Sequence, residues 1–184
     1  MIITSLPLSG LALVTPEPHA DRRGVFIESY RADIFATHGI QARFAQQNQS
    51  RSHAQVIRGL HFQFDPPAGK LVRVVSGEAF AAFVDLRRKS STFGQSFAMI
   101  LSEENRLAIF SPPGFAFGFA TLAEPTDMQY LLTEVYHQAG DGTIRWNDPA
   151  LHINWPVQHP IISERDEKAT TLAQWLMRPE SHIW

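Results

Sequence analysis

Glycine and proline recur along the whole chain and separate short apolar runs. There are 11 glycines and 12 prolines among 184 residues, and they are spread evenly rather than gathered in a linker. Short apolar runs bounded by such residues are typical of strands and turns, whereas alternating strands and helices would need longer periodic segments. The pattern therefore predicts an all-β sandwich or barrel. No internal repeat interrupts it, so we expect one domain over residues 1–184.

The apolar runs predict a series of strands, and two packed antiparallel sheets of eight or more strands would form a jelly roll. Several of these runs are rich in β-branched or aromatic residues. The predicted strands are Val56–Gln63, Lys70–Val75, Ala79–Leu86, Arg106–Phe110, Gly118–Leu122 and Met128–Val135. Two short helices are expected to flank the sheets: Ser29–His38, which ends at Gly39, and a segment from about Glu164 to Met177, with Ser163 as its N-cap and Pro179 as its stop.

Composition excludes several classes of protein. The chain contains no cysteine, which removes disulfide frameworks, thiolate metal sites and cysteine nucleophiles. Sixteen basic residues against 18 acidic ones give a net charge of −2, so we expect no nucleic acid as a partner. No apolar stretch reaches the roughly 18 residues that a membrane span needs. The start of the sequence has no basic region before a long apolar run, so we expect a cytoplasmic protein with no membrane partner.

Histidine is the residue type that most suggests chemistry, with eight in the chain. No two histidines are spaced as H-x-H along a strand or H-x-x-x-H along a helix, so we expect no bound metal. His61 stands out because it lies inside the predicted strand Val56–Gln63. Strict alternation places Ile57, Gly59, His61 and Gln63 on one face and Arg58, Leu60 and Phe62 on the other, unless a bulge intervenes. His61 is either a buried histidine held by a hydrogen bond or a general base, and a base needs a carboxylate to orient its ring.

Several motifs follow one another along most of the chain, from about residue 21 to residue 166. They are DRRGVFIE at Asp21–Glu28, FAQQNQSRS at Phe44–Ser52, RGLHFQ at Arg58–Gln63, KLVRV at Lys70–Val74 with Gly77, VDLR at Val84–Arg87, PGFAFGF at Pro113–Phe119, WNDP at Trp146–Pro149, WP at Trp155–Pro156 and SERD at Ser163–Asp166. In these motifs and their order the chain resembles the dTDP-4-dehydrorhamnose 3,5-epimerases. The resemblance implies a cupin-like jelly-roll β-sandwich with short flanking helices and an isomerase activity.

The resemblance also implies a reaction without cofactor or metal. The substrate would be a nucleotide-diphosphate 4-keto-6-deoxy sugar, in which the ketone at C4 acidifies the hydrogens at C3 and C5. Epimerisation needs a base, a group that stabilises the enolate oxygen, and an acid on the opposite face of the sugar. By resemblance, His61 is the base and Asp166 orients it. Lys70 stabilises the enolate, and Tyr130 is the acid.

A second set of residues is expected to bind the nucleotide sugar. Arg58 and Arg23 are the candidates for the diphosphate, because a guanidinium matches phosphate oxygens in a forked geometry. By resemblance, the segment with Arg23, Phe26 and Glu28 reaches across a homodimer interface to the neighbouring site. The resemblance further implies that Gln46, Asn48 and Phe117 line the site.

Each of these candidates also has a purely structural explanation. Asp166 comes three residues after Ser163, as the acid of a capping box does. Tyr130 lies in an apolar strand and suits an ordinary core position. Lys70 at a strand start suits a solvated lysine, and Arg23 suits a turn before Gly24.

Three positions depart from the pattern of the family. Phe117 replaces a histidine, Ala81 replaces an aspartate near the lysine, and Leu131 replaces a lysine that often follows the tyrosine. Loss of a carboxylate partner should lower the pKa of Lys70. We expect these three changes to lie around one pocket and therefore predict an epimerase of altered specificity, acting at C3, at C5 or at both. The alternatives are an epimerase of one carbon or a ketoisomerase on a different nucleotide sugar, and a non-catalytic homologue that binds a sugar nucleotide.

Overall fold

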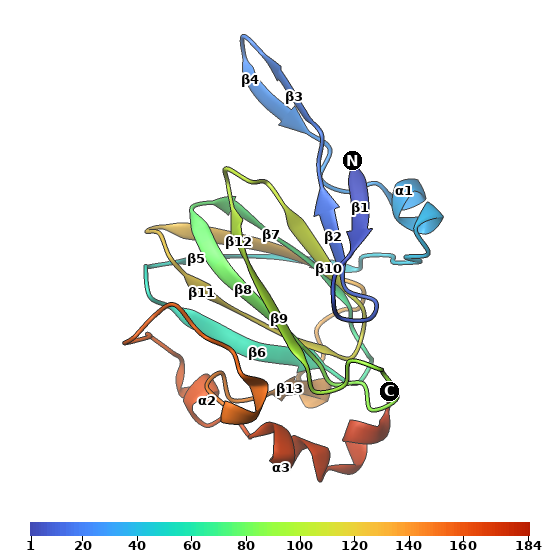
Figure 1. Ribbon diagram of the computed structural model, residues 1–184, viewed down its shortest axis with the longest axis vertical. Coiled ribbons are helices and arrows are strands. Elements are labelled where there is room, and N and C mark those ends of the chain that lie inside the picture. Colours follow the sequence, from blue (N-terminus) through green and yellow to red (C-terminus); the bar gives the residue numbers. More distant parts are fainter.

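Two antiparallel sheets face each other in the computed structural model, which describes all residues 1–184 (Figure 1). One sheet has six strands in the order β1-β2-β10-β7-β12-β5, and the other has five in the order β13-β6-β11-β8-β9. A separate hairpin, β3-β4, projects from the body of the molecule (Figure 1). The all-β sandwich predicted from the spacing of glycine and proline is confirmed.

The structure contains 13 short strands, and six of them, β6, β7, β8, β10, β11 and β12, correspond to predicted runs to within three residues at each end. The strands are β1 Ile2–Ser5, β2 Ala12–Thr15, β3 Pro18–Asp21, β4 Gly24–Ile27, β5 Gln46–Ser52, β6 Ile57–Gln63, β7 Lys70–Ser76, β8 Glu78–Asp85, β9 Ser96–Ser102, β10 Ala108–Ser111, β11 Phe115–Thr121, β12 Thr126–Leu132 and β13 Asp141–Thr143. Strand β11 begins three residues earlier than predicted, at Phe115 rather than Gly118, because Phe115–Phe117 pair with β8.

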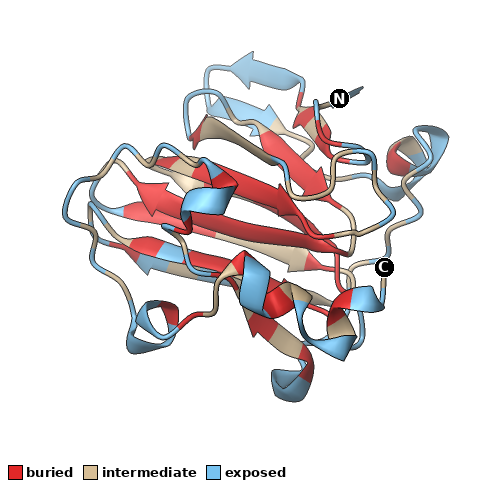
Figure 2. Ribbon diagram, turned by 60° about the horizontal axis from the view of Figure 1, so that its bottom comes forward, coloured by how far each residue is buried: buried red, intermediate tan, exposed pale blue.

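Apolar residues fill the space between the sheets and also the outer face of each. Between the sheets, Val72 and Met128 of the six-stranded sheet pack in one cluster with Phe83 and Phe117 of the five-stranded sheet. The helices α2 Glu164–Glu167 and α3 Leu172–Leu176 lie outside the five-stranded sheet, where Trp175 packs on Phe62. Figure 2 shows the buried strands at the centre and, around them, helices with one buried and one exposed side.

The six-stranded sheet is covered on its outer face by α1, Ala32–Thr37, whose Phe35 packs on Phe110. Three 3₁₀ helices complete the fold: η1 Gln138–Gly140, η2 Pro149–Leu151 and η3 Pro179–His182. None of the helices is long and apolar enough to cross a membrane.

The single helix predicted from Glu164 to Met177 is wrong, because the structure divides this segment into α2 and α3. Between them, Thr170 forms a parallel bridge with Ile144, and its backbone oxygen accepts a hydrogen bond from the backbone N–H of Arg145 at 2.8 Å. These bonds use the backbone in an extended conformation and so interrupt the helix. Thr171 then caps a new helix in a capping box with Gln174. Ser163 is the N-cap of α2, as predicted.

Strict alternation along β6 is also wrong, because a bulge intervenes. His61 pairs with Phe117 and Arg58 pairs with Phe119, so β6 uses one more residue than β11 between these two pairs. Gly59 sits in the bulge with a φ of +126°, and a Cβ there would lie 2.5 Å from the Cα of Gly118. Glycine is therefore required at this close crossing. The bulge lets the side chains of Arg58 and His61 line the same cavity.

Candidate active site

A cavity of about 300 Å³ lies between the two sheets. Strands β5, β7 and β12 of the six-stranded sheet form one wall, and β6, β11 and β13 form the other. Of the residues proposed as catalytic, three line this cavity: His61, Lys70 and Tyr130. The fold thus gathers side chains that lie as far as 69 residues apart, since β6, β7 and β12 come together in space.

His61 is held by a carboxylate behind it. Its Nε2 lies 2.6 Å from Oδ1 of Asp166, and the second oxygen, Oδ2, accepts a hydrogen bond from the backbone N–H of Gly59 at 3.3 Å. A neutral imidazole that donates from Nε2 carries its lone pair on Nδ1. The side chain of His61 is about one third exposed (32%), so the ring is both oriented and accessible. This is the arrangement that a general base requires.

Asp166 combines this role with a place in a helix cap. Its backbone N–H donates to Oγ of Ser163 at 3.2 Å, so the serine caps α2 as the capping explanation predicted. Its carboxylate, however, turns inward to His61, and the residue is only 2% exposed. Burial alone would raise the pKa of Asp166, but the hydrogen bonds from His61 and Gly59 outweigh it and lower the pKa. Ser163 therefore caps the helix without a capping box, and the carboxylate of Asp166 orients His61 instead of capping the helix.

Lys70 is a buried cation at the cavity wall. Its residue is 7% exposed, and Nζ donates a hydrogen bond to the backbone oxygen of His61 at 2.8 Å. Burial lowers the pKa of Lys70 to about 8; the charge of Asp141 acts against this shift, and that of Arg165 adds to it. The direction agrees with the expectation from the missing aspartate, but the main cause is burial. A solvated surface lysine, the structural alternative, is excluded.

Tyr130 lies on the wall opposite His61. It belongs to β12 in the six-stranded sheet, whereas His61 belongs to β6 in the five-stranded sheet, and both side chains line the cavity. A ring bound between the sheets would present one face to each residue. That placement suits an acid and a base that act on opposite faces of one substrate.

The predicted binding residues fall into two groups. Arg58, Asn48 and Phe117 line the cavity, and Gln46 supports it by donating from Nε2 to Oδ1 of Asn48 at 2.9 Å. Arg58 donates to Oγ of Ser52 at 3.1 Å and has no carboxylate partner within the chain.

The second group lies elsewhere, on and beside the projecting β3-β4 hairpin. Arg23 pairs with Asp21 at 2.5 Å and Phe26 is 69% exposed, so neither contributes to the cavity of its own chain. Glu28 follows the hairpin and lies 3.8 Å from Arg31. The segment was predicted to serve the site of a neighbouring subunit, and that contribution stays a prediction.

The three departures from the family pattern do not surround one pocket, contrary to the expectation. Ala81 is buried in the core between the sheets, and Leu131 packs in the cluster that contains Phe35 on the outer face of the six-stranded sheet. Leu131 follows Tyr130 directly in β12, and because successive side chains of a strand point to opposite faces, Leu131 faces away from the cavity. Only Phe117 lines the cavity.

Three titratable residues at the cavity were missed by reasoning from the sequence: Tyr136, Asp141 and Arg165. Arg165 pairs with Asp141 at 2.7 Å and donates to Thr143. The place of Arg165 next to Asp166 in the SERD motif was the one available signal. Tyr136 and Asp141 lie around a 3₁₀ turn after β12, and nothing in the local sequence points to the cavity.

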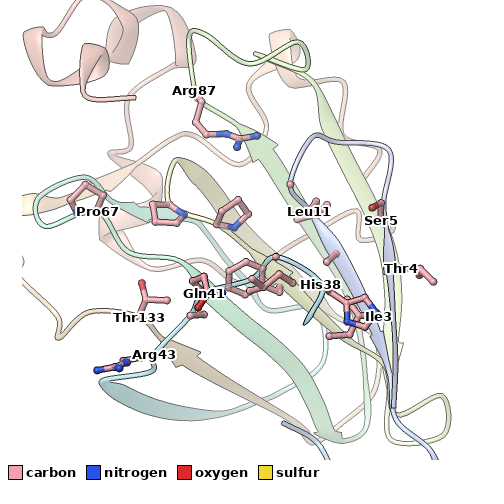
Figure 3. A pocket seen from close by; sticks show the side chains of 18 of the residues that line it. Ile3, Thr4, Ser5, Leu11, His38, Gln41, Arg43, Pro67, Arg87 and Thr133 are labelled. Atoms are coloured by element: carbon pink, nitrogen blue, oxygen red, sulfur yellow. The ribbon is translucent and has the colours of Figure 1, made fainter. Parts of the chain in front are cut away.

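A larger cavity, of about 860 Å³, lies beside β1 and β2 and the loop at residues 38–43 (Figure 3). Its charged residues are not arranged for catalysis. Arg87 is bound to the buried Asp85, Nδ1 of His38 contacts the backbone oxygen of Ile34, and Arg43 lies on the far side from Arg87 (Figure 3). No group of three or more His, Asp or Glu residues in the structure is placed to hold a metal ion. The smaller cavity is therefore the candidate active site.

Known proteins resemble this chain over almost its whole length. The sequence model of the dTDP-4-dehydrorhamnose 3,5-epimerases matches residues 5–174. A dTDP-4-dehydrorhamnose 3,5-epimerase of Methanothermobacter thermautotrophicus is 46% identical over 86% of this chain and 88% of its own length. A dTDP-4-dehydrorhamnose 3-epimerase of Streptomyces niveus is 37% identical over 95% of this chain and 85% of its own length. The structure of a dTDP-6-deoxy-D-glucose-3,5-epimerase of Legionella pneumophila in complex with dTDP-4-keto-L-rhamnose matches with a TM-score of 0.92 at 39% identity, covering 98% of this chain and 96% of that one.

Proposed function

Because this chain belongs to the dTDP-4-dehydrorhamnose 3,5-epimerase family, it is a sugar-nucleotide isomerase, and we propose how its residues divide the reaction. The substrate is a dTDP-linked 4-keto-6-deoxy sugar that enters the cavity between the sheets. The observation that carries the proposal is the contact of 2.6 Å between Nε2 of His61 and Oδ1 of Asp166, at the edge of a cavity that Lys70 and Tyr130 also line.

His61 removes the proton. The ketone at C4 acidifies the hydrogens at C3 and C5, and Nδ1 of His61 accepts one of them as the C–H bond breaks. The electron pair of that bond moves toward C4 and forms an enolate. Asp166 holds the ring in the tautomer that exposes Nδ1 and stabilises the imidazolium that forms, because its buried carboxylate is ionised.

Lys70 stabilises the enolate oxygen. Its ammonium has three N–H donors and uses one of them for the backbone oxygen of His61. The remaining donors are available to the oxygen at C4 as negative charge develops on it. In a buried site such a preplaced cation favours the charged intermediate over the neutral ketone.

Tyr130 returns a proton to the opposite face of the carbon. Its hydroxyl protonates the carbanionic carbon from the six-stranded sheet while His61 holds the removed proton on the side of the five-stranded sheet. Configuration at that carbon is thereby inverted. The tyrosinate then regains a proton from solvent, and His61 releases its own. The same pair serves C3 or C5, whichever carbon the bound sugar presents.

Arg58 and the hairpin residues bind the nucleotide diphosphate. Arg58 lines the cavity as a cation without a carboxylate partner, which suits a phosphate. We infer that the chain forms a homodimer in which Arg23, Phe26 and Glu28 act at the neighbouring site. The support is the exposure of Phe26 and Val25 on a hairpin that projects from the body (Figure 1). We also infer a cytoplasmic location, where nucleotide-activated sugars are made.

Deuterium exchange tests this function directly. The protein is incubated with a dTDP-4-keto-6-deoxyhexose in deuterated water, and C3 and C5 are followed by NMR. Deuterium at both carbons identifies a 3,5-epimerase, and deuterium at one carbon identifies a single-carbon epimerase. Exchange at neither, on this and other nucleotide sugars that bind, would leave a sugar-nucleotide binder without catalysis and reject the proposal.

The single-carbon alternative is favoured by one observation. Phe117 places an apolar ring in the cavity, in register with His61, where it offers no hydrogen bond to a sugar hydroxyl. A sugar that needs such a hydrogen bond to turn its second reactive carbon, C3 or C5, toward His61 would then be epimerised at one carbon only. The ratio of deuterium at C3 and C5 decides between the two reactions.

A further inference from the structure

Lys70 holds its charge in the cavity without a carboxylate in contact. Its ammonium donates one hydrogen bond, to the backbone oxygen of His61, and no acidic side chain lies within ion-pair distance. A buried ammonium in this situation is normally neutral or stabilised by another source of negative potential. The groups that lie close to Nζ therefore decide how far the charged form is favoured, beyond the charge of Asp141.

The ring of Phe117 lies against the ammonium. Nζ of Lys70 is 5.7 Å from the centroid of the ring, within the range at which the negative face of an aromatic ring attracts a cation. Phe117 is itself fixed: it is 5% exposed, stacks near Phe119 at 6.0 Å and contacts Phe83 at 5.1 Å. Its backbone pairs with His61. The ring is therefore a rigid support between the base and the cation.

We propose that Phe117 is a positioning residue that holds the ammonium of Lys70 beside the enolate oxygen and favours its charged form in place of a carboxylate. The inference rests on the proposed function. A carboxylate partner would neutralise part of the charge that the enolate needs, whereas an aromatic face leaves the full positive charge and two N–H donors to the substrate. Phe117 thus acts on the reaction through Lys70 as well as by shaping the cavity.

Other groups around Lys70 do not replace this support. Asp141 on β13 raises the pKa of Lys70 through space, but its carboxylate is paired with Arg165 at 2.7 Å, and Arg165 lowers that pKa. Of the other titratable groups that line the cavity, Arg58 and His61 on β6 and Tyr130 on β12 are not carboxylates, and burial raises the pKa of Tyr136. Asp166, from α2, is bound to His61.

Lysine-selective NMR measures the effect without substrate. The chain has only three lysines, at 70, 89 and 168, so ¹³Cε labelling gives three signals, and the one lost in Lys70→Met is assigned to Lys70. Phe117→Leu removes the aromatic face and should lower the pKa of Lys70 by about half to one pH unit. Phe117→Tyr keeps the face and should leave the pKa within about 0.2 unit. An unchanged titration in Phe117→Leu would overturn the proposal.

Controls separate placement of the cation from general packing. Phe80→Leu makes the same change in a ring that packs on Trp155, outside the cluster that contains Phe117, and does not line the cavity, so it should leave the titration of Lys70 unchanged. Phe117→Met, close to leucine in volume, repeats the test if Phe117→Leu does not fold. In the wild-type protein the ring current of Phe117 should displace the Hε protons of Lys70 upfield relative to Lys89 and Lys168, and the absence of that displacement would also contradict the proposal.

Enzyme assays distinguish this proposal from the function on which it rests. The alkaline limb of kcat in the deuterium-exchange assay should move down with the pKa of Lys70 in Phe117→Leu, with a smaller change in KM. A shifted titration of Lys70 in a protein that catalyses no exchange would uphold the role of Phe117 and reject the proposed function. If Phe117→Leu catalyses exchange, but neither the alkaline limb of kcat nor the titration of Lys70 moves, the proposed function is upheld and the role of Phe117 is rejected.

Discussion

The imidazole of His61 contacts the carboxylate of Asp166 at 2.6 Å, although 105 residues separate them in the sequence. The contact depends on two local features. The bulge at Gly59 turns the end of β6 so that its backbone N–H also reaches the carboxylate, and Ser163 begins α2 so that Asp166 points inward. The bulge in β6 and the cap of α2 therefore together bring the carboxylate of Asp166 to the ring of His61.

Asp166→Asn should reduce deuterium exchange by about 10²-fold or more, because an amide can hold the ring in the wrong tautomer and cannot stabilise an imidazolium.

His61→Ala should reduce deuterium exchange by about 10²- to 10⁴-fold while leaving dTDP affinity within a factor of about three. Exchange rates by NMR and calorimetric binding measure the two effects. Glu164→Gln, in the first turn of α2 and exposed, is the matched control. Near-normal exchange in His61→Ala would mean that another group is the base.

The acid stability of the protein should depend on the same carboxylate. Because the pKa of Asp166 is lowered in the folded protein, the unfolded state binds its proton first as the pH falls. The stabilisation is therefore complete above about pH 4 and is lost as the pH falls through the lowered native pKa. Urea unfolding between pH 2.5 and 6 should show a weaker pH dependence in Asp166→Asn than in the wild-type protein. If the free energy of unfolding changes equally with pH in both proteins, protonation of the Asp166 carboxylate does not contribute to acid unfolding.

Lys70 should set the alkaline limit of activity. Its pKa of about 8 means that kcat falls as the pH rises above 8, since the neutral amine cannot stabilise the enolate in the same way. The free energy of unfolding should change in the opposite direction to kcat over this pH range. Between about pH 8 and 10.5 the unfolded chain holds a proton that the native lysine has lost, so the contribution of Lys70 to the free energy of unfolding rises with pH.

Lys70→Met separates these two effects. It removes the charge, keeps an apolar side chain of similar length, and should lower exchange by about 10²- to 10³-fold. The same change should stabilise the protein by ~1–3 kcal/mol at pH 7, because a buried cation with a strongly lowered pKa disfavours folding. A rise in Tm of several degrees by calorimetry is the expected result. Lys89→Met is the control, and a fall in Tm in Lys70→Met would contradict the assignment.

Gly59→Ala should prevent normal folding of the site. The new Cβ would lie 2.5 Å from the Cα of Gly118, and the φ of +126° is strained for any residue with a side chain. We expect a loss of more than about 3 kcal/mol in stability, or no soluble protein. Gly94→Ala tests the contribution of φ alone, since Gly94 has a φ of +74° and a Cβ there would meet nothing within 4 Å. Similar stabilities for the two variants would show that the close approach is not limiting.

The spacing of glycine and proline and the run at Ala79–Leu86 were sufficient to predict an all-β sandwich, because both depend on local sequence. Elements decided by distant contacts could not be predicted from local patterns. The helix from Glu164 to Met177 is divided by the bridge between Thr170 and Ile144, and the bulge in β6 is required by its crossing with Gly118. Tyr136 and Asp141 reach the cavity for the same reason, by the path of the chain after β12.

The candidate site was predictable mainly where motifs carried it. Spacing alone left His61 as either a core residue or a base, and the resemblance to the family joined it to Asp166. Ala81 and Leu131 were given too much weight, because a departure from a pattern does not reveal which face of a sheet it occupies. Only the three-dimensional arrangement shows that Phe117 alone alters the cavity.

A mixed dimer can test whether the β3-β4 hairpin serves the neighbouring site. Arg23→Ala/Phe26→Ala should weaken substrate binding strongly if this exposed hairpin clamps the nucleotide, and His61→Ala removes the base. When the two inactive proteins are unfolded together and refolded at equal amounts, half of the dimers contain one chain of each kind. In those dimers the chain with an intact His61 receives an intact hairpin from its partner, so one of the two sites works. Activity at low substrate concentration should return to about a quarter of the wild-type value, whereas a hairpin that serves its own chain would give no recovery, because every site would then lack either the base or the clamp.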